Sequence, residues 1–264
     1  MIRELMRQEG LKLVTQRYPY LLLVALLGLQ MARMLALALT PPQTVLDVVS
    51  APQLWADGMA WALRLLVFIV LVQGAMAFAQ EFALGTAKTV LVLPVRRRDW
   101  CLAKLAALVL LAWGLLAVAA LLGAGIVALT LGWGDVVREG LVLRSRAEYA
   151  PALLLGLALT ALQLLPLCAF ALLVGLFFTN SGAAVGVAVL LGVLLESAAG
   201  LFGSGRYVFL YHLHRPLALL EQLGKGLPFS WHDALTQGLA VALAWFVVLG
   251  AAAWLHLERM DIPG

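Results

Sequence analysis

Residues 151–178 read PALLLGLALTALQLLPLCAFALLVGLFF, a run without a single charged side chain. A membrane-spanning helix needs about 20 continuous apolar residues, whereas a transmembrane barrel strand has about ten that alternate between apolar and polar. This run is continuous and too long for a strand, so it predicts a transmembrane α-helix. Five more such runs follow the same rule. The sequence therefore predicts one all-α polytopic membrane domain over residues 1–264, with spans at 18–39, 59–80, 105–131, 151–178, 183–202 and 234–256.

The composition agrees with a membrane protein and argues against a soluble one. Hydrophobic residues make up 64% of the chain and charged residues 12%, whereas soluble domains have about 45–50% and about 25%. The net charge of +4 is spread between the apolar runs rather than gathered on one basic surface, so no nucleic-acid partner is expected. The polar first 17 residues precede an apolar run too long for a signal peptide, which predicts an uncleaved anchor.

The distribution of Lys and Arg predicts the orientation of the spans. The loop between the first two spans has neither residue, whereas the loop at residues 81–104 has five: Lys88, Arg96, Arg97, Arg98 and Lys104. Because positive loops stay in the cytoplasm, both termini are expected inside. Residues 1–17 are expected to form an interfacial helix, and residues 203–233 an external re-entrant segment of short helices interrupted at Pro216, Gly224 and Gly226. Asp57 is expected in the first external loop, and residues 132–149 in a mixed-charge loop.

The most distinctive stretch is residues 80–104, QEFALGTAKTVLVLPVRRRDWCLAK. Gly85 allows the chain to turn, Thr86 can cap a short helix, and Pro94 stops that helix. Leu91 and Leu93 offer apolar side chains to a docking partner. An ordinary basic loop would explain the arginines, but not the Gly-Thr pair followed by Leu-Pro.

This stretch resembles the cytoplasmic loop of bacterial ABC-2 type permeases, in which an acidic residue closes the second span and a Lys opens the third. The ending at residues 257–262, LERMDI, is similar to the short tail common in that family. The resemblance implies a coupling helix that docks on an ATP-binding subunit. The coupling residues that it implies are Glu81, Gly85, Thr86, Lys88, Leu91, Leu93, Pro94 and Arg96.

The same resemblance implies the permease half of an ATP-driven exporter, of the ABC-2 or type V kind, in the bacterial cytoplasmic membrane. The chain has no Gly-x-x-x-x-Gly-Lys-Ser/Thr sequence, so we expect it not to be an enzyme by itself and to bind no cofactor. ATP and Mg²⁺ would bind to a partner ATPase present in two copies. A second permease chain, identical or paralogous, would complete the path among membrane lipids.

Ionisable and amide side chains inside the spans are candidates for a path or gate, because a central charge costs about 2.5 to 3.5 kcal/mol to insert. One hypothesis pairs Glu196 with Arg33 or Arg64 near an external gate. Snorkelling arginines and a protonated glutamate are the alternative. Gln73 and Gln163 fit either a path lining or hydrogen bonds between helices.

Two other classes of function remain open at this point. A transporter driven by an ion gradient would use Glu196 as its proton or cation site, although no internal repeat of the kind common in that class is evident. An intramembrane hydrolase would use Ser204 with His212 or His256, but no oxyanion-hole motif accompanies Ser204. His212 and His214 are spaced i, i+2, which does not favour a metal site. The substrate stays open, although an apolar path suits lipids or hydrophobic compounds.

Overall fold

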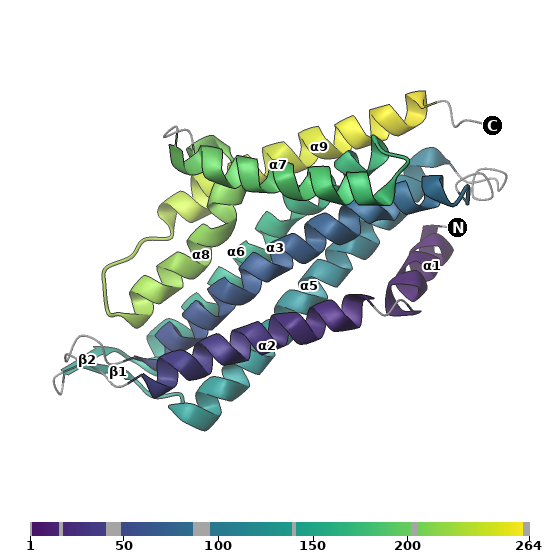
Figure 1. The fold of residues 1–264 in the computed structure, drawn as a ribbon. Helices are drawn as coiled ribbons and strands as arrows, with labels where there is room; N and C mark the ends of the chain where they lie inside the picture. The colour runs from purple at the N-terminus through teal and green to yellow at the C-terminus, as the bar shows by residue number, and fades with distance from the viewer. Residues whose placement is uncertain are drawn as a thin grey trace.

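A computed structural model describes residues 2–15, 18–40, 49–86, 96–138, 141–201 and 205–260. Helices make up nearly all of this part of the chain (Figure 1). The first half contains α1 (Ile2–Thr15), α2 (Tyr18–Leu39), α3 (Ala51–Ala83), α5 (Arg97–Thr130) and the hairpin β1 (Val136–Arg138) and β2 (Leu141–Arg144). The second half contains α6 (Arg146–Leu176), α7 (Ser181–Leu201), η2 (Gly205–Tyr207), α8 (Phe209–Gly224), η3 (Ala234–Gly238) and α9 (Leu239–Arg259).

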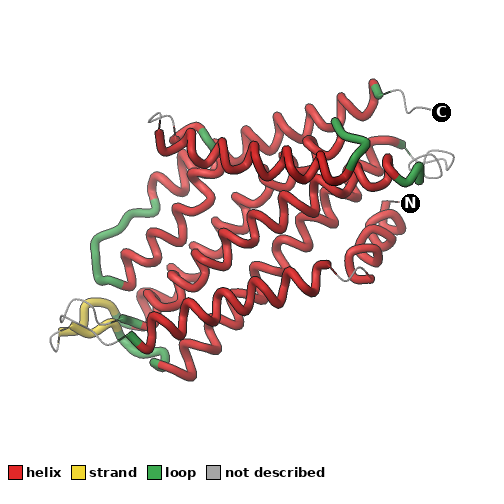
Figure 2. Tube along the Cα trace, in the orientation of Figure 1, coloured by secondary structure: helices red, strands yellow, loops and turns green. Residues whose placement is uncertain are grey.

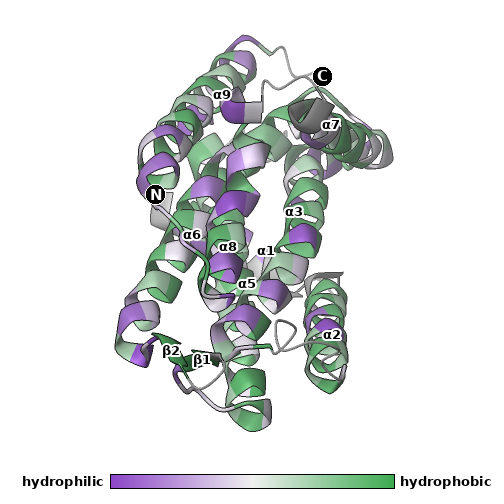
Figure 3. Cartoon of the chain, turned by 90° about the vertical axis from the view of Figure 1, so that its left-hand side faces the viewer, coloured by the Kyte–Doolittle hydropathy of each residue, from purple (hydrophilic) through white to green (hydrophobic). Residues whose placement is uncertain are grey.

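Six helices are long and apolar enough to cross a membrane: α2, α3, α5, α6, α7 and η3 continued by α9. Hydrophobic residues cover most of their length (Figure 3). The described ends of the chain lie at one end of the bundle, and the β1–β2 hairpin and the loop after α8 lie at the other (Figures 1 and 2). The chain is therefore an all-α polytopic membrane protein apart from this hairpin, as predicted. We call the end that holds the termini the inner end and the opposite end the outer end.

Helix α3 is the central element, because it packs against α2, α5, α6, α7 and α8. Its 33 residues correspond to about 50 Å at 1.5 Å per residue, more than the hydrocarbon thickness of about 30 Å. It begins at Ala51, not at residue 59 as predicted, because the Ser50 hydroxyl caps it by accepting from the Gln53 N–H at 3.3 Å. Asp57, expected in a loop, consequently lies inside the helix, and the loop prediction for this residue was wrong.

Helices α3 and α6 cross closely because small residues meet at the crossing. A Cβ atom added to Gly175 of α6 would lie 2.5 Å from the carbonyl oxygen of Ala75. A Cβ on Gly74 would collide with the Ala171 side chain. Ala171 and Gly175 are four residues apart, which is the small-xxx-small pattern that lets membrane helices approach. The backbones therefore come close in the inner half of α3.

Two further helices begin earlier than predicted. Helix α5 begins at Arg97, so residues 97–104 are helical and only the preceding residues remain for a loop. Helix α6 begins at Arg146, where the backbone N–H of Ser145 donates to Glu148 Oε2 at 3.3 Å. The expected mixed-charge loop before α6 contains the antiparallel pair β1–β2. Both helices thus extend beyond their apolar runs, and a capping box at Ser145 and Glu148 begins α6.

Helix α8 is one continuous helix of 16 residues, not short helices interrupted at Pro216. It packs against α3 and α6. Its last residue, Gly224, touches the beginning of α3: a Cβ there would collide with Gln53, and the Ser50 hydroxyl donates to the Gly224 carbonyl at 2.6 Å. Gly226 follows with a φ of 72°, where glycine is favoured. Glycine therefore ends the helix where sequence analysis placed a break.

Candidate functional site

Four charged side chains meet at the inner end, and we call them the inner clamp: Glu9 and Lys12 of α1, Glu81 of α3 and Lys104 of α5. Glu81 Oε1 accepts from Lys12 Nζ at 2.7 Å and from Lys104 Nζ at 2.8 Å. Glu9 Oε1 accepts from Lys12 at 3.0 Å, and Glu9 Oε2 from Lys104 at 3.2 Å. Each carboxylate therefore binds both ammonium groups. The clamp joins the peripheral helix α1 to the two helices on either side of residues 84–96.

The clamp is partly removed from solvent. The Lys104 side chain is 1% exposed and that of Glu81 11%, and the Lys104 ammonium lies 5.3 Å from the Phe78 ring centroid and 5.6 Å from that of Trp100. Desolvation opposes the charge on Lys12, but its hydrogen bonds to Glu81 and Glu9 outweigh this, so the pKa of Lys12 is raised. Lys12 therefore stays charged at any physiological pH.

The structure describes four of the eight predicted coupling residues. Glu81 is in the clamp, and Gly85 follows α3 with a φ of 68°, the left-handed conformation expected of a turn glycine. The Thr86 hydroxyl donates to the Glu81 carbonyl at 3.4 Å, and Arg96 is the N-cap residue of α5. The predictions for Lys88, Leu91, Leu93 and Pro94 fall outside the described residues.

Arg97 makes a second contact at the inner end that sequence analysis missed. Its Nη1 donates to the carbonyl oxygens of Leu257 at 3.0 Å, Glu258 at 3.2 Å and Met260 at 2.8 Å. The last carbonyls of a helix lack partners within the helix, so a guanidinium at this place satisfies the end of α9. This contact could not be predicted from the basic run that contains Arg97, because its partners are backbone carbonyls about 160 residues later in the chain.

A row of polar side chains lies toward the outer end, across α2, α3, α7 and α8. Arg33 of α2 is bound to Asp57 of α3, with Nε to Oδ2 at 2.8 Å and Nη2 to Oδ1 at 3.1 Å. Both Arg33 and Arg64 lie over the Trp61 ring, at 5.6 and 4.9 Å from its centroid. We call Arg33, Asp57, Arg64, His214 and Glu196 the outer polar row.

The hypothesis that Glu196 pairs with Arg33 or Arg64 is corrected by these contacts. Glu196 instead lies 3.8 Å from Nε2 of His214 in α8. Arg33 binds Asp57 instead, because the first turns of α3, which were not predicted to be helical, place Asp57 beside Arg33. The three residues named from the sequence do come to one region, because Arg33 and Arg64 share the Trp61 ring and both Arg64 and Glu196 act electrostatically on His214.

On α3 the polar row forms part of a stripe. Asp57, Trp61, Arg64, Phe68 and Leu71 follow each other at alternating spacings of four and three residues, so they share one helix face. Of these five residues Leu71 is buried, because α7 packs against it near Gly192. Phe68 is 43% exposed, and Arg64 is also exposed.

The two predicted amide residues are buried rather than set along an open surface. Gln73 is 7% exposed and Gln163 is fully buried. Gln163 has no hydrogen-bond partner for either amide atom within the described chain, and neither has Nδ1 of buried His212. Both groups face Gly238 of η3: a Cβ there would lie 3.2 Å from Gln163 Nε2 and 3.5 Å from His212 Nδ1. A hydrogen bond between helices, one of the two predicted roles, is therefore not formed by Gln163.

The residues of the hydrolase hypothesis are not brought together. Ser204 lies outside the described residues. His212 Nε2 is 2.8 Å from the Arg206 carbonyl oxygen, and His256 stacks on Phe177 at 4.3 Å. Within the described residues no group of three or more His, Cys, Asp or Glu is arranged to hold a metal ion.

Comparison with known proteins places the chain in a family. No curated protein gives a significant match. The family described as "Protein of unknown function (DUF2705)" matches residues 18–263, which include all six membrane-length helices and α8. The match covers nearly the whole chain, and the chain belongs to this DUF2705 family.

Proposed function

We propose that this chain is the permease subunit of an ATP-driven exporter and that two permease chains enclose its path. The observation that carries the proposal is charge exposed on membrane-length apolar helices. Arg64 is exposed on α3, and the Glu196 side chain is 58% exposed on α7. Charged groups inside a membrane face other protein or a water-filled cavity, since lipid contact is costly. A lone chain leaves these two groups at its surface.

The degree of burial indicates which face a second chain would cover. In the most apolar stretch of α2 and of α7 only 17% of the residues are buried, whereas 61% are buried in the corresponding stretches of α3 and α6. The stripe on α3 lies between these two sparsely packed helices. A second copy packed against α2, the α3 stripe and α7 would enclose the outer polar row in a shared space. This arrangement would give a path with polar groups at its outer end.

The inner clamp supports coupling to a separate ATPase. A partner that pushes on the segment between α3 and α5 would move Glu81 and Lys104, which begin and end that region, together with α1. Because α3 packs against five other helices, its movement would reach most of the bundle. The resemblance of residues 80–104 to the ABC-2 coupling loop supports ATP as the source of energy. ATP and Mg²⁺ would then bind to two copies of the partner, in a bacterial cytoplasmic membrane.

Affinity capture from native membranes in mild detergent tests the coupling. In the test variant a neutral linker of equal length replaces residues 85–93, and in the control variant a neutral linker of equal length replaces residues 225–230 at the outer end. We expect the native chain and the control variant to retain an ATP-binding subunit and the test variant to lose it while keeping its native unfolding midpoint. The absence of an ATPase with the native chain would refute ATP-driven export.

Disulfide cross-linking tests the second chain. In a background with Cys101→Ala and Cys168→Ala, we expect Phe68→Cys to form a covalent dimer in oxidised membranes. Leu154→Cys is a matched control, since Leu154 is 70% exposed on α6, outside the proposed interface. Equal dimer yields from both variants would contradict the interface.

A transporter driven by an ion gradient remains the second candidate because of the Glu196–His214 contact. Burial lowers the pKa of His214, Glu196 raises it and Arg64 lowers it, and the net pKa lies below the ordinary value. His214 is therefore neutral at neutral pH, and its ring, 3.8 Å from the Glu196 side chain, would be the group that takes up and releases a proton in such a transporter. Transport that persists without an ATPase and stops when the proton gradient is dissipated would favour this candidate.

A further inference from the structure

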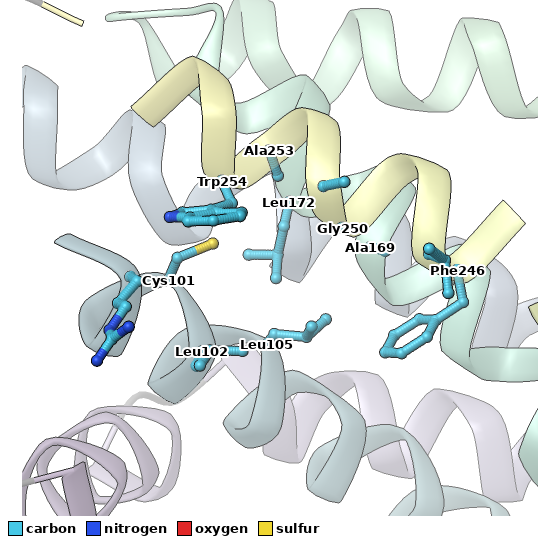
Figure 4. Close-up of a pocket in the computed structure, with 12 residues that line it drawn as sticks. Cys101, Leu102, Leu105, Ala169, Leu172, Phe246, Gly250, Ala253 and Trp254 are labelled. Carbon is cyan, nitrogen blue, oxygen red and sulfur yellow. The ribbon is translucent and has the colours of Figure 1, made fainter. Parts of the chain in front are cut away.

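An apolar groove lies between α5 and α9, and α6 forms its floor. Its volume is about 390 Å³, within the range of roughly 300–1,000 Å³ typical of small-molecule sites. Leu102 and Leu105 line it from α5, Leu172 from α6, and Phe246, Gly250 and Trp254 from α9. Trp254 lies at one end of the groove beside Cys101, and Phe246 lies at the other (Figure 4). The groove follows α9 from Phe246 to Trp254, about 12 Å at 1.5 Å per residue.

Gly250 leaves room for the groove, and Arg97 joins α5 to α9 beyond its inner end. Gly250 has no atom within 4 Å of an added Cβ, so α9 presents an empty space there. Beyond Trp254, Arg97 binds the last carbonyls of α9 and draws the ends of α5 and α9 together. The groove thus lies beside the place where the basic end of α5 meets the end of α9.

Charge is concentrated at that inner end. Among the twelve described residues that line the groove, Arg98 alone is charged, and its side chain is 50% exposed. Arg98 Nε lies 3.6 Å from Asp99, while its Nη groups make no hydrogen bond within the described chain. Arg96 and Arg259 are also exposed at these joined helix ends. Glu258 is engaged as acceptor of the Trp254 Nε1–H at 2.9 Å.

We propose that this groove binds one acyl chain of an anionic phospholipid, with the lipid phosphate at Arg98. The apolar walls match the acyl chain, and a guanidinium at the inner end matches a phosphate, to which arginine can donate two parallel hydrogen bonds. An excess of arginines at the same end selects a headgroup with net negative charge over a zwitterionic one. The site is independent of the exporter proposal, since it needs only insertion in a membrane.

Quenching of tryptophan fluorescence by brominated lipids tests the site. The full chain is reconstituted in two kinds of nanodisc that both contain phosphatidylglycerol and phosphatidylcholine. In one kind the acyl chains of phosphatidylglycerol are brominated, and in the other those of phosphatidylcholine. The bromine content of the two is equal. The fluorescence of Trp254 is the difference between the native chain and Trp254→Phe. We expect Trp254 to be quenched several-fold more by the brominated anionic lipid. Equal quenching by both lipids would mean unselective contact with bulk lipid and would overturn the proposal.

Three variants separate the parts of the site. Arg98→Gln is expected to lower the preference for the anionic lipid roughly fivefold, the effect typical of one basic residue at an anionic membrane surface. Gly250→Leu adds a side chain where a Cβ atom has open space within the groove, and it is expected to abolish selective quenching. Gly114→Leu is the matched control, since Gly114 also has open space and does not line the groove. Native quenching in Gly250→Leu would overturn the proposal, as would a Trp254 that neither lipid quenches, because protein would then cover the groove.

Discussion

Replacement of Lys104 by Met is expected to destabilise the protein by about 3 kcal/mol. Removal of one partner from a buried ion pair costs about 3 to 5 kcal/mol, because the other charge is left unpaired. The Lys104 side chain is 1% exposed and serves both Glu81 and Glu9. We expect the lower end of this range of destabilisation, because Lys12 still contacts both carboxylates. Methionine keeps the apolar stem against Phe78 and Trp100, so packing changes little.

The matched control is Lys12→Met, which removes the other ammonium group of the clamp. The Lys12 side chain is 49% exposed, so its ion pairs are screened and its loss should cost about 1 kcal/mol or less. Unfolding of the purified variants in mixed micelles of increasing dodecyl sulfate content measures both changes. The double variant Glu81→Gln with Lys104→Met should recover part of the lost stability, because it no longer has at position 81 a buried carboxylate that has lost one of its two ammonium partners.

The reasoning would be refuted if Lys104→Met were no more destabilising than Lys12→Met. That result would mean that water reaches Glu81 and Glu9 once the lysine is gone, so that burial adds nothing to the pair. It would also remove the argument that the clamp holds α1 firmly to α3 and α5.

Three further predictions follow from other contacts. Arg97→Gln should raise hydrogen exchange at the end of α9 and cost roughly 1 to 2 kcal/mol, because the carbonyls lose a charged donor. Gly175→Val should prevent stable folding, measured as the yield of monodisperse protein, since its side chain meets the Ala75 backbone, whereas Gly114→Val should be tolerated. The pKa of His214 is lowered in the folded state, so just below pH 6.5 the unfolded chain binds more protons than the folded chain. The unfolding midpoint should therefore fall when the pH is lowered through this range. The fall should be smaller in the variant His214→Gln.

The architecture of this chain could be predicted largely from its apolar runs. A run of about 20 apolar residues has few folded forms in a membrane other than a helix, because every backbone group must be satisfied internally. The ends of the helices were less predictable. The cap at Ser50 and the early start of α5 at Arg97 lie outside the apolar runs from which the spans were predicted, so the runs alone do not mark these helix ends.

The partners of charged side chains were also beyond the sequence. Glu81 and Lys104 were both singled out, the first as a coupling residue and the second as the end of the loop, but nothing in the sequence indicated that α1 would bring Glu9 and Lys12 to them. The gate hypothesis paired Glu196 with an arginine because oppositely charged residues inside spans usually meet. It failed because Asp57 was assigned to a loop, so the true partner of Arg33 was left out of the comparison.

Both clusters of charge are attached to α3, and the close crossing with α6 lies between them. Glu81 is seven residues from Gly74, about 10 Å along the axis, and Arg64 is ten residues away in the other direction, about 15 Å. A rigid helix that tilts about this crossing moves Arg64 and Glu81 in opposite directions, by amounts in the ratio of about 1.4 to 1. In the proposed function, a push of the ATPase at the inner clamp would therefore move Arg64 the opposite way and slightly further. The exposed charge of Arg64 is then placed where a small displacement at the inner clamp is slightly amplified.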